Sequence, residues 1–361
     1  MKAAVYRGLE KPILVEDVEL ASTEGSEVLV DIDSCGVCHS DLHIMNMMPE
    51  APMPMIFGHE AAGIVKEVGD NVTSVEVGDH VIIAFYGSCG FCFHCVKGMR
   101  QLCTNRDFAD RQFDGVRPRL KVGGIPTMQG VGVGGWATQA LMPESSIIKV
   151  RKDAPLDKIG LIGCGVMTGV GAAINTAAVE PGSDVAVIGC GGVGLNIIQG
   201  ARLAGANKII AVDLMDSKLE MARQFGATHC VSGANGDPVA QVQALAPTLD
   251  YAFEAIGLGI TVQQAFAMIR PGGTAVVVGV GMGKVAEIPV GDFLQEKKLI
   301  GCMYGSGQVH VDIPRLVDLY MEGKLELDAL ISKVRPLSEV KEAFDDMKGG
   351  NVARTMLDVN A

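Results

Sequence analysis

One short segment of the chain contains four cysteines, Cys89, Cys92, Cys95 and Cys103, at the spacing C-x2-C-x2-C-x7-C. Four thiolates so closely spaced can close a tetrahedral shell around one Zn²⁺, and a closed shell leaves no position for a substrate. The spacing therefore predicts a structural zinc site. An iron–sulfur cluster is the alternative, although the fourth cysteine of ferredoxin motifs typically stands beside a proline. We expect His94, inside the same segment, to be a surface residue rather than a ligand.

A second set of metal-binding residue types is spread over three distant segments: Cys38 in CGVCHSDLH, His59 with Glu60 in FGHEAAG, and Cys164 in IGCGVMTG. Two thiolates and one imidazole would bind zinc with three protein ligands and leave a fourth position for a substrate oxygen. Asp41 is a candidate to orient His59, because metal-bound histidines usually hydrogen-bond to a carboxylate or carbonyl. Taken singly, a free cysteine is usually a core residue and a lone histidine a structural one. The sequence alone does not show that these segments meet.

A third pattern lies between two short apolar runs, Asp184 to Ile188 and Lys208 to Asp213, which suit buried parallel strands. Between them Gly189, Gly191 and Gly194 follow the spacing G-x-G-x-x-G and precede a segment with helical periodicity. In such a turn the glycines serve, in order, the tight turn, close approach of a pyrophosphate and helix-on-strand packing. The free N–H groups at the helix start favour phosphate binding.

The residue that closes the second of these strands is acidic. A carboxylate about 20 positions after the glycines suits a ribose 2′-hydroxyl and repels a 2′-phosphate, so Asp213 indicates NAD rather than NADP. FAD and S-adenosylmethionine sites also use this turn, and a glycine turn without any ligand is the remaining alternative. The choice among these ligands depends on the rest of the chain.

Length and charge limit the possible classes of protein. A chain of 361 residues suggests two domains, because single cores stop growing near about 250 to 300 residues. A net charge of −12 without a Lys/Arg cluster argues against nucleic acid or an anionic membrane as partner. The opening MKAAVYRGLEKP is too polar for a signal sequence, so we expect a cytoplasmic protein whose ten cysteines are reduced or bind metal.

One uncharged segment, Ile159 to Val179, is long enough to span a bilayer. It contains five glycines and is followed by Pro181, and its many Gly, Ala, Thr and Asn residues make it only weakly apolar. We therefore expect a buried helix preceded by a turn.

The distribution of expected elements indicates an α/β chain. Residues 1 to about 150 contain short strands separated by turn residues, which predicts a β-rich domain; the clearest are 3–6, 28–32, 61–68 and 80–84. From about 180 to 300, strands and helices alternate, which predicts a parallel doubly wound sheet; the clearest are helices 218–225 and 262–268 and strands 251–255 and 273–279. The last part predicts helices near 314–321 and 337–347 and a strand near 354–359.

Several segments together resemble one known family. GVCHSDLH, GHEAAGIVKEVG, VGDHVI, the four-cysteine segment, CGVMTGVGAA and VIGCGGVG occur in the order found in the zinc-dependent medium-chain alcohol dehydrogenases. The resemblance covers essentially the whole chain, and the long segment between Cys103 and Trp136 is similar to the liver-type branch. It implies a β-rich GroES-like catalytic domain, residues 1–166 and 305–361, and a Rossmann NAD-binding domain, residues 167–304.

The resemblance also implies roles for the metal-binding residues. Cys38, His59 and Cys164 match the catalytic zinc ligands, and Glu60 matches an occasional replacement ligand. Ser40 and His43 fall where the family has its proton relay. Together with the four-cysteine site, this implies two Zn²⁺ per chain.

For the cofactor, the resemblance implies that NAD lies on the turn of Gly189, Gly191, Gly192, Val193 and Gly194. Asp213 and Lys218 match the ribose-binding positions of the family. Thr168 matches a residue beside the nicotinamide, and Arg354 matches a pyrophosphate contact. His39 stands where many relatives carry an arginine on the pyrophosphate. Without the resemblance, Lys218 and Arg354 would equally well be solvated charges.

The substrate is the least determined part. Phe85 and Trp136 match apolar positions of the family's substrate pocket, and Phe108 with the methionine-rich run Met45 to Met55 would extend it. An apolar pocket of this kind suits medium-sized apolar or aromatic primary alcohols, which would be oxidised reversibly to aldehydes. The alternative is that the methionines are ordinary core residues. An alternative is a formaldehyde dehydrogenase acting on the S-hydroxymethyl adduct of a thiol, for which Arg106 is a candidate cation.

An alternative of another class is a noncatalytic nucleotide-binding protein that has kept the fold. The expected partners are a small alcohol or aldehyde and further copies of the chain. The segment Val285 to Leu299 lies where the family pairs two cofactor domains, which implies a homodimer or homotetramer.

Overall fold

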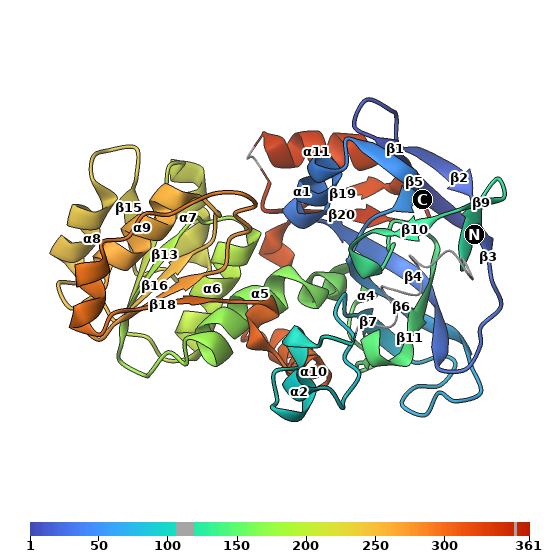
Figure 1. Cartoon of the computed structure of the whole chain (residues 1–361), viewed down its shortest axis with the longest axis horizontal. Coiled ribbons are helices and arrows are strands. Elements are labelled where there is room, and N and C mark those ends of the chain that lie inside the picture. The colour runs from blue at the N-terminus through green and yellow to red at the C-terminus, as the bar shows by residue number, and fades with distance from the viewer. Residues whose placement is uncertain (106–118, 350–351) are drawn as a thin grey trace. The chain divides into compact units, whose positions relative to one another are not determined.

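The structure is a computed structural model that describes residues 1–105, 119–349 and 352–361. The chain divides into two compact units (Figure 1): the first unit comprises Met1–Cys164 with Gln308–Ala361, and the second unit comprises Gly165–Gly307. The boundaries expected from the sequence, between 166 and 167 and between 304 and 305, lie a few residues from these.

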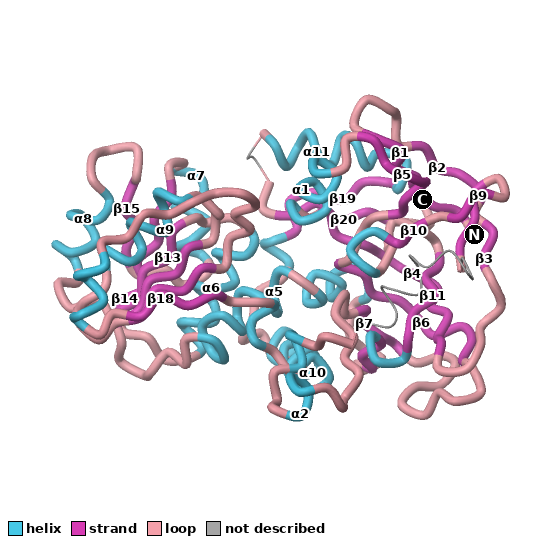
Figure 2. The backbone as a smooth tube through the Cα atoms, in the orientation of Figure 1, coloured by secondary structure: helices cyan, strands magenta, loops and turns pink. Residues whose placement is uncertain are grey.

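The second unit contains a six-stranded parallel sheet in the order β15-β14-β13-β16-β17-β18. Numbered along the chain, this order is 3-2-1-4-5-6, that of a doubly wound dinucleotide-binding fold. Helices alternate with these strands (Figure 2), as predicted. The elements are β13 Asp184–Ile188, α6 Gly192–Leu203, β14 Lys208–Asp213, α7 Asp216–Gln224, β15 His229–Ser232, α8 Pro238–Leu245, β16 Tyr251–Glu254, α9 Gly259–Met268, β17 Thr274–Val277 and β18 Lys298–Gly301.

The central strands of this sheet are buried apolar runs. In β13, for example, Val185 to Ile188 are all buried, because a parallel sheet covered by helices has no solvated face. Pro238 begins α8 directly after Asp237, whose carboxylate accepts a hydrogen bond from the Val239 N–H. Proline at the first helical position and aspartate at the cap both favour a helix start.

The first unit is rich in β-structure. Its largest sheet has seven strands in the order β12-β7-β6-β4-β20-β19, with β11 paired to β4. A four-stranded sheet has the order β10-β5-β1-β2, and a three-stranded sheet the order β3-β8-β9. The strands are β1 Lys2–Gly8, β2 Leu14–Asp17, β3 Glu19–Leu20, β4 Glu27–Val37, β5 Glu50–Ile56, β6 Glu60–Val68, β7 His80–Ile83, β8 Leu120–Val122, β9 Ile125–Pro126, β10 Met128–Gln129, β11 Gln139–Pro143, β12 Ile147–Lys149, β19 Ile331–Pro336 and β20 Arg354–Asp358.

The C-terminal part of the chain belongs to this unit because β20 pairs antiparallel with β4, and β19 pairs parallel with β20. The helices of the unit are α1 His39–Met47, α2 Phe93–Val96, α4 Leu156–Ile159, α10 Val309–Met321 and α11 Val340–Lys348. Helix α1 follows β4 directly, and this junction places the CGVCHSDLH segment at one end of the large sheet.

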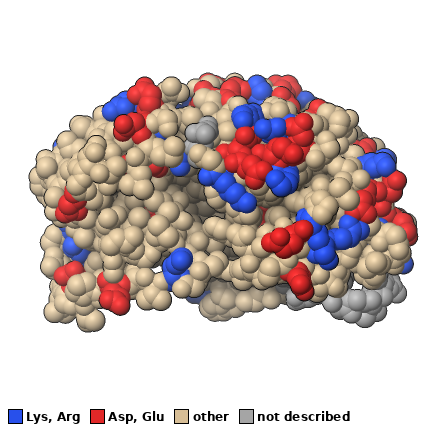
Figure 3. All heavy atoms as spheres, turned by 90° about the horizontal axis from the view of Figure 1, so that it is seen from above, with Lys and Arg blue, Asp and Glu red and all other residues tan. Residues whose placement is uncertain are grey.

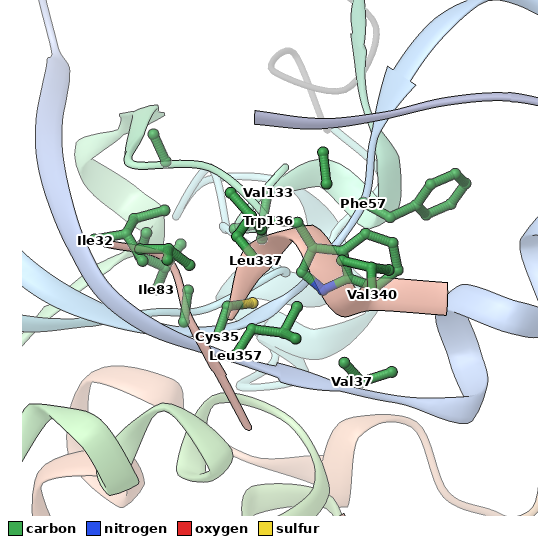
Figure 4. Close-up of a cluster of buried hydrophobic side chains, with 14 of the residues drawn as sticks. Ile32, Cys35, Val37, Phe57, Ile83, Val133, Trp136, Leu337, Val340 and Leu357 are labelled. Carbon is green, nitrogen blue, oxygen red and sulfur yellow. The ribbon is translucent and has the colours of Figure 1, made fainter. Parts of the chain in front are cut away.

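The core of the first unit is centred on aromatic rings (Figure 4). Trp136 has no exposed surface and its ring lies 6.0 Å from that of Phe57 and 5.4 Å from that of Phe344. Of the methionine-rich run, Met45 and Met55 are buried in the same cluster. These methionines are therefore core residues, and a role for Trp136 in a substrate pocket stays a prediction.

The apolar segment 159–179 is helical in several pieces: α4, a 3₁₀ turn Gly160–Gly163, α5 Gly165–Gly171 and a π-helical turn Ala172–Thr176. Within the described ranges, no single helix is both long and apolar enough to cross a membrane. One bent pair of helices, Leu156–Gly163 with Gly165–Thr176, reaches that threshold when taken together.

Charged side chains on one face of the molecule are mixed in sign. On the face drawn in Figure 3, Lys and Arg side chains lie among Asp and Glu side chains. Among the described residues on that face there is no purely basic patch of the kind that tracks nucleic-acid phosphates.

Candidate metal centres and dinucleotide turn

The four cysteines of the first predicted site come together in the structure. The sulfur atoms of Cys89, Cys92, Cys95 and Cys103 all lie within 4.8 Å of one another. The Cys92 N–H donates to Cys89 Sγ over 3.3 Å, and the Cys89 N–H donates to Cys103 Sγ over 3.4 Å. Amide N–H groups directed at sulfur favour the thiolate form, and four thiolates at this separation match a closed zinc shell.

The three distant ligands of the second predicted site also meet. Cys38 is the N-cap residue of α1, His59 lies in the connection between β5 and β6, and Cys164 follows the 3₁₀ turn at Gly160–Gly163. Their ligand atoms lie within 4.8 Å of one another and all three side chains are buried. The sequence did not show this juxtaposition; the pairing of β4 with β6 produces much of it.

Asp41 organises this second cluster. Its Oδ1 atom lies 3.0 Å from His59 Nδ1 and accepts a hydrogen bond from the Gly58 N–H over 3.1 Å. Its Oδ2 atom accepts from the Cys38 N–H over 3.4 Å. Because a carboxylate only accepts, His59 Nδ1 carries the proton and Nε2 presents a lone pair.

That lone pair accepts no hydrogen bond from the described residues. His59 Nε2 is buried and makes no hydrogen bond within the described part of the chain. An unpartnered buried imidazole nitrogen beside two thiols is the observation expected of a metal ligand. The three residues therefore fit a zinc ion with three protein ligands.

Contacts within the cluster shift the pKa values of its three ligand side chains. A hydrogen bond from Cys164 holds the pKa of the Cys38 thiol well below its usual value, and the same bond together with burial raises that of Cys164. Burial lowers the pKa of His59, but the Asp41 carboxylate and Cys38 outweigh it and raise that pKa well above its ordinary value. Zinc binds thiolates and the neutral imidazole, so metal binding releases the protons that this environment favours on His59 and Cys164.

Behind the cluster lies a buried ion pair. Glu60 has no exposed surface, and its Oε1 atom lies 3.7 Å from Arg354 Nε, which is itself buried. Burial raises the pKa of Glu60 to about 7, although Arg354 opposes the shift. A Cβ at Gly36 would lie 2.3 Å from Glu60 Oε2, so glycine is required there for this carboxylate to pack. The predicted contact of Arg354 with a pyrophosphate stays a prediction.

Four other predicted residues of the first unit, Ser40, His43, His39 and Phe85, are described by the structure. Ser40 Oγ is 3.7 Å from Cys38 Sγ, and His43 lies one turn further along α1. His39 is exposed, with its ring 6.3 Å from that of His43. The ring of Phe85 stands edge-on to His59 at 5.4 Å. Phe108 and Arg106 lie outside the described residues.

In the second unit the three glycines differ in the way that dinucleotide binding requires. Gly189 has φ +93°, a left-handed conformation that suits a tight turn. A Cβ at Gly194 would lie 1.7 Å from the Gly189 carbonyl oxygen, so this residue permits close packing. A Cβ at Gly191, which caps α6, would meet no atom within 4 Å, so the space beside it is open to a ligand.

Asp213 ends β14 beside this turn. One carboxylate oxygen accepts from the Cys190 N–H over 2.8 Å, and the other accepts from the Met215 N–H over 3.1 Å. The carboxylate is thereby fixed at the carboxyl edge of the sheet, where nucleotides bind in such folds. The remaining predicted contacts, Gly192, Val193, Lys218 and Thr168, lie in α6, α7 and α5.

Comparison with known proteins gives the family. The profile described as zinc-binding dehydrogenase matches residues 192–322, and the alcohol dehydrogenase GroES-like domain matches residues 24–152. The chain is 38% identical to alcohol dehydrogenase class-3 of Cereibacter sphaeroides, with 99% of each chain covered. The chain belongs to the zinc-dependent medium-chain alcohol dehydrogenases.

Other relatives of this alcohol dehydrogenase carry different names. It is 38% identical to S-(hydroxymethyl)glutathione dehydrogenase of Paracoccus denitrificans, with 99% of each chain covered. Among solved structures, benzyl alcohol dehydrogenase from Acinetobacter calcoaceticus superposes with a TM-score of 0.92 at 34% identity, again with 99% of each chain covered. The predicted fold and family are confirmed, and the protein is an NAD- and zinc-dependent enzyme of that family.

We predict that Asp41→Asn weakens the three-ligand zinc site of this dehydrogenase without affecting the four-cysteine site. The variant loses the charge that fixes His59, and loss of such a partner typically costs about 10- to 100-fold in metal affinity. Zinc release to a chelator, followed over time, should show one faster equivalent per chain. Asp31→Asn, which alters a half-exposed carboxylate paired with Lys66, is the control. Equal release from both variants would contradict the assignment.

We also predict that alanine disturbs folding at one glycine of the turn and NADH binding at another. Gly194→Ala should prevent the second unit from packing, because its Cβ would collide with the Gly189 carbonyl. Gly191→Ala should fold with a near-normal melting temperature but bind NADH more weakly, since the methyl group enters the open space. Thermal unfolding and NADH fluorescence measure the two effects; normal NADH affinity of Gly191→Ala would argue against the turn as the pyrophosphate site.

Proposed function

We propose that this enzyme oxidises primary alcohols to aldehydes reversibly, with Cys38, His59 and Cys164 holding the catalytic zinc and the four-cysteine cluster holding a structural one. The observation that carries the proposal is the contrast between the two clusters. One has four ligands and is closed, whereas the other has three ligands and a buried His59 Nε2 without a protein partner in the described chain. An open coordination position is the property of catalytic zinc sites.

The residues around the open cluster have distinct roles in this proposal. When bound, zinc supplies a Lewis acid that polarises the alcohol oxygen. Asp41 keeps His59 in the tautomer that presents Nε2. Ser40, beside Cys38, would accept the proton of the substrate hydroxyl while its own hydroxyl proton passes by way of the cofactor ribose to His43; such acid–base steps contribute about 10²- to 10⁴-fold. Glu60 remains a reserve ligand behind the cluster.

For NAD, the proposed site is the glycine turn, with the pyrophosphate beside Gly191 and the ribose hydroxyls on Asp213 and Lys218. The open space at Gly191 and the fixed carboxylate of Asp213 support this placement. Val193 would pack behind a ring of the cofactor, and Thr168 would neighbour the nicotinamide. His39 and Arg354 are proposed as pyrophosphate contacts.

As substrate we propose the S-hydroxymethyl adduct of a cellular thiol, rather than the simple apolar alcohols favoured by the sequence. Such an adduct is itself a primary alcohol, so the chemistry at the cluster is the same. The support is that curated relatives from Paracoccus denitrificans and Photobacterium damsela, at 38% and 37% identity, are named S-(hydroxymethyl)glutathione dehydrogenase.

A benzylic alcohol is the second candidate. Two observations favour it: the edge-on Phe85 ring next to His59 provides an apolar aromatic wall, and benzyl alcohol dehydrogenase is among the similar structures. For the cellular location we propose the cytoplasm, because the thiolates of both clusters hold zinc only while they stay reduced.

The two substrate classes are separated by thiol dependence. We predict that NAD⁺ reduction with formaldehyde requires added glutathione and exceeds the rate with benzyl alcohol at equal concentration. The controls are glutathione without formaldehyde and formaldehyde with a thiol-free peptide. Turnover of benzyl alcohol with no response to glutathione would establish the second candidate instead, and binding of NADH without turnover of either would indicate a noncatalytic protein.

We further propose that two copies of the chain pair through the edge of the second unit's sheet. The edge strand is β18, and the preceding segment exposes large apolar side chains: Val285 is 79%, Val290 82% and Leu294 88% exposed. An exposed sheet edge with apolar neighbours is a surface that soluble proteins normally cover.

If this edge is the interface, Leu294→Asp should shift the sedimenting species towards a monomer at micromolar concentration. Val77→Asp, which changes an exposed valine of the first unit, is the matched control and should leave the assembly unchanged. A Leu294→Asp variant that sediments like the wild type would remove this edge from the interface.

A further inference from the structure

Helix α1 carries two of the proposed catalytic residues but is short. It has nine residues, among them Ser40 and His43. Isolated helices of fewer than about 12 residues are marginal in water, so contacts from the rest of the fold must hold both ends. At the first turn, the carboxylate of Asp41 accepts from the Cys38 N–H. The contacts at the last turn then determine how firmly His43 is placed.

The last turn of α1 lacks the residues that usually end a helix. Helices often end with a glycine in the left-handed conformation, or with a basic side chain near the last carbonyl groups. The C-cap residue of α1 is Met48, which has φ −123°, and the last turn contains no basic residue. The Met48 N–H donates to the carbonyl groups of Ile44 and Met45, both over 3.1 Å. The other carbonyl groups at this end need donors from outside the helix.

A tyrosine hydroxyl from strand β1 supplies such a donor. The Tyr6 hydroxyl lies 3.1 Å from the Met45 carbonyl oxygen and 2.8 Å from the Met48 carbonyl oxygen. Burial raises the pKa of the Tyr6 phenol, so the hydroxyl stays protonated and remains a donor. Helix α1 is therefore capped by a side chain that stands 39 and 42 positions before the two carbonyl groups it contacts.

The position of Tyr6 is itself fixed by its surroundings. The side chain is buried, and its ring stands edge-on to that of Phe57 at 5.4 Å. Strand β1 pairs antiparallel with β5, and Tyr6 lies opposite Met55 in that pairing. Just beyond it, the Leu9 N–H donates to the Pro49 carbonyl over 2.9 Å. Residues of β1 and its end therefore hold both the last turn of α1 and the chain that leaves it.

His43 depends on this helix for its placement. Its Nδ1 atom is buried and makes no hydrogen bond to any residue that the structure describes. No hydrogen bond at this atom orients the ring, so the ring follows the backbone of α1. We infer that Tyr6 is a positioning residue for proton transfer: by capping the last turn of α1, it holds His43 where the proposed relay requires it. The inference rests on the relay role proposed for His43.

The variant Tyr6→Phe removes the hydroxyl and leaves the rest of the side chain in place. It keeps the ring and its packing, and the Met45 carbonyl still accepts from the Met48 N–H. We therefore expect the variant to fold and to retain both zinc ions. Tyr320→Phe is the matched control, because it removes a tyrosine hydroxyl of the same unit, on α10, that lies 3.3 Å from Asp328 Oδ2.

The experiment measures the rate of NADH formation in a single turnover of the full-length zinc enzyme, because this rate is not masked by product release. The substrate is formaldehyde plus glutathione or benzyl alcohol, whichever the wild type oxidises faster. We expect Tyr6→Phe to lower the rate about fivefold, as for the loss of one hydrogen bond. The KM for the substrate and the Kd for NADH should change less than about twofold, because Tyr6 touches neither. Tyr320→Phe should match the wild type.

A double-mutant cycle separates positioning from general stability. If Tyr6 acts through His43, Tyr6→Phe should lower the rate no further in a His43→Gln background. The same fold reduction in both backgrounds would overturn the inference, as would a wild-type rate in Tyr6→Phe alone. A wild-type rate in His43→Gln would instead refute the proposed relay itself. That result is distinguishable from failure of the Tyr6 inference, in which His43→Gln is slow and Tyr6→Phe is not.

Discussion

The hydrogen bond between Asp41 and His59 is the interaction on which the candidate active site depends. One buried carboxylate accepts from the Cys38 N–H, the Gly58 N–H and the His59 ring, and so joins the start of α1 to the segment before β6. Without it, the imidazole has no fixed tautomer, and its lone pair is not directed at the two sulfur atoms. Asp41 thus joins two of the three chain segments that carry the ligands.

Other contacts in the first unit hold these segments in place. Tyr6, buried in β1, donates its hydroxyl towards the carbonyl groups of Met45 and Met48, which are at the C-terminal end of α1. Its ring stands edge-on to Phe57, which precedes the Gly58-His59 pair. The helix that begins with a metal ligand is therefore anchored at its first turn by Asp41 and at its last turn by Tyr6. The second unit repeats this principle, since the buried carboxylate of Glu254, at the end of β16, accepts hydrogen bonds from the Ile256 and Gly257 N–H groups.

The sequence predicted those features whose geometry lies within a short stretch of chain. The four-cysteine site and the glycine turn are of this kind, because the spacing of their residues largely determines their shape. The alternation of strands and helices after residue 180 likewise determined the parallel sheet. The meeting of Cys38, His59 and Cys164 required the family resemblance, because it depends on the pairing of strands far apart in sequence.

Other features had no sequence signal. The pairing of Glu60 with Arg354 joins residues almost three hundred positions apart, through the pairing of β20 with β4. Trp136 is a different case: the family resemblance places it at an apolar position of the substrate pocket, and the structure buries it beside Phe57 and Phe344, so its role in the pocket stays a prediction. An aromatic residue fits a core and a pocket equally well until its neighbours are known.

The chain builds one closed four-cysteine site and one open three-ligand site for zinc. The most direct test of this arrangement is the zinc content of the wild-type enzyme, Cys164→Ser and Cys95→Ser, measured together with alcohol oxidation. We expect two zincs per chain in the wild type, and one zinc with no turnover but intact NADH binding in Cys164→Ser. Cys95→Ser should lose the other zinc. A wild type with a single zinc, or a Cys164→Ser variant that retains two zincs and turnover, would contradict it.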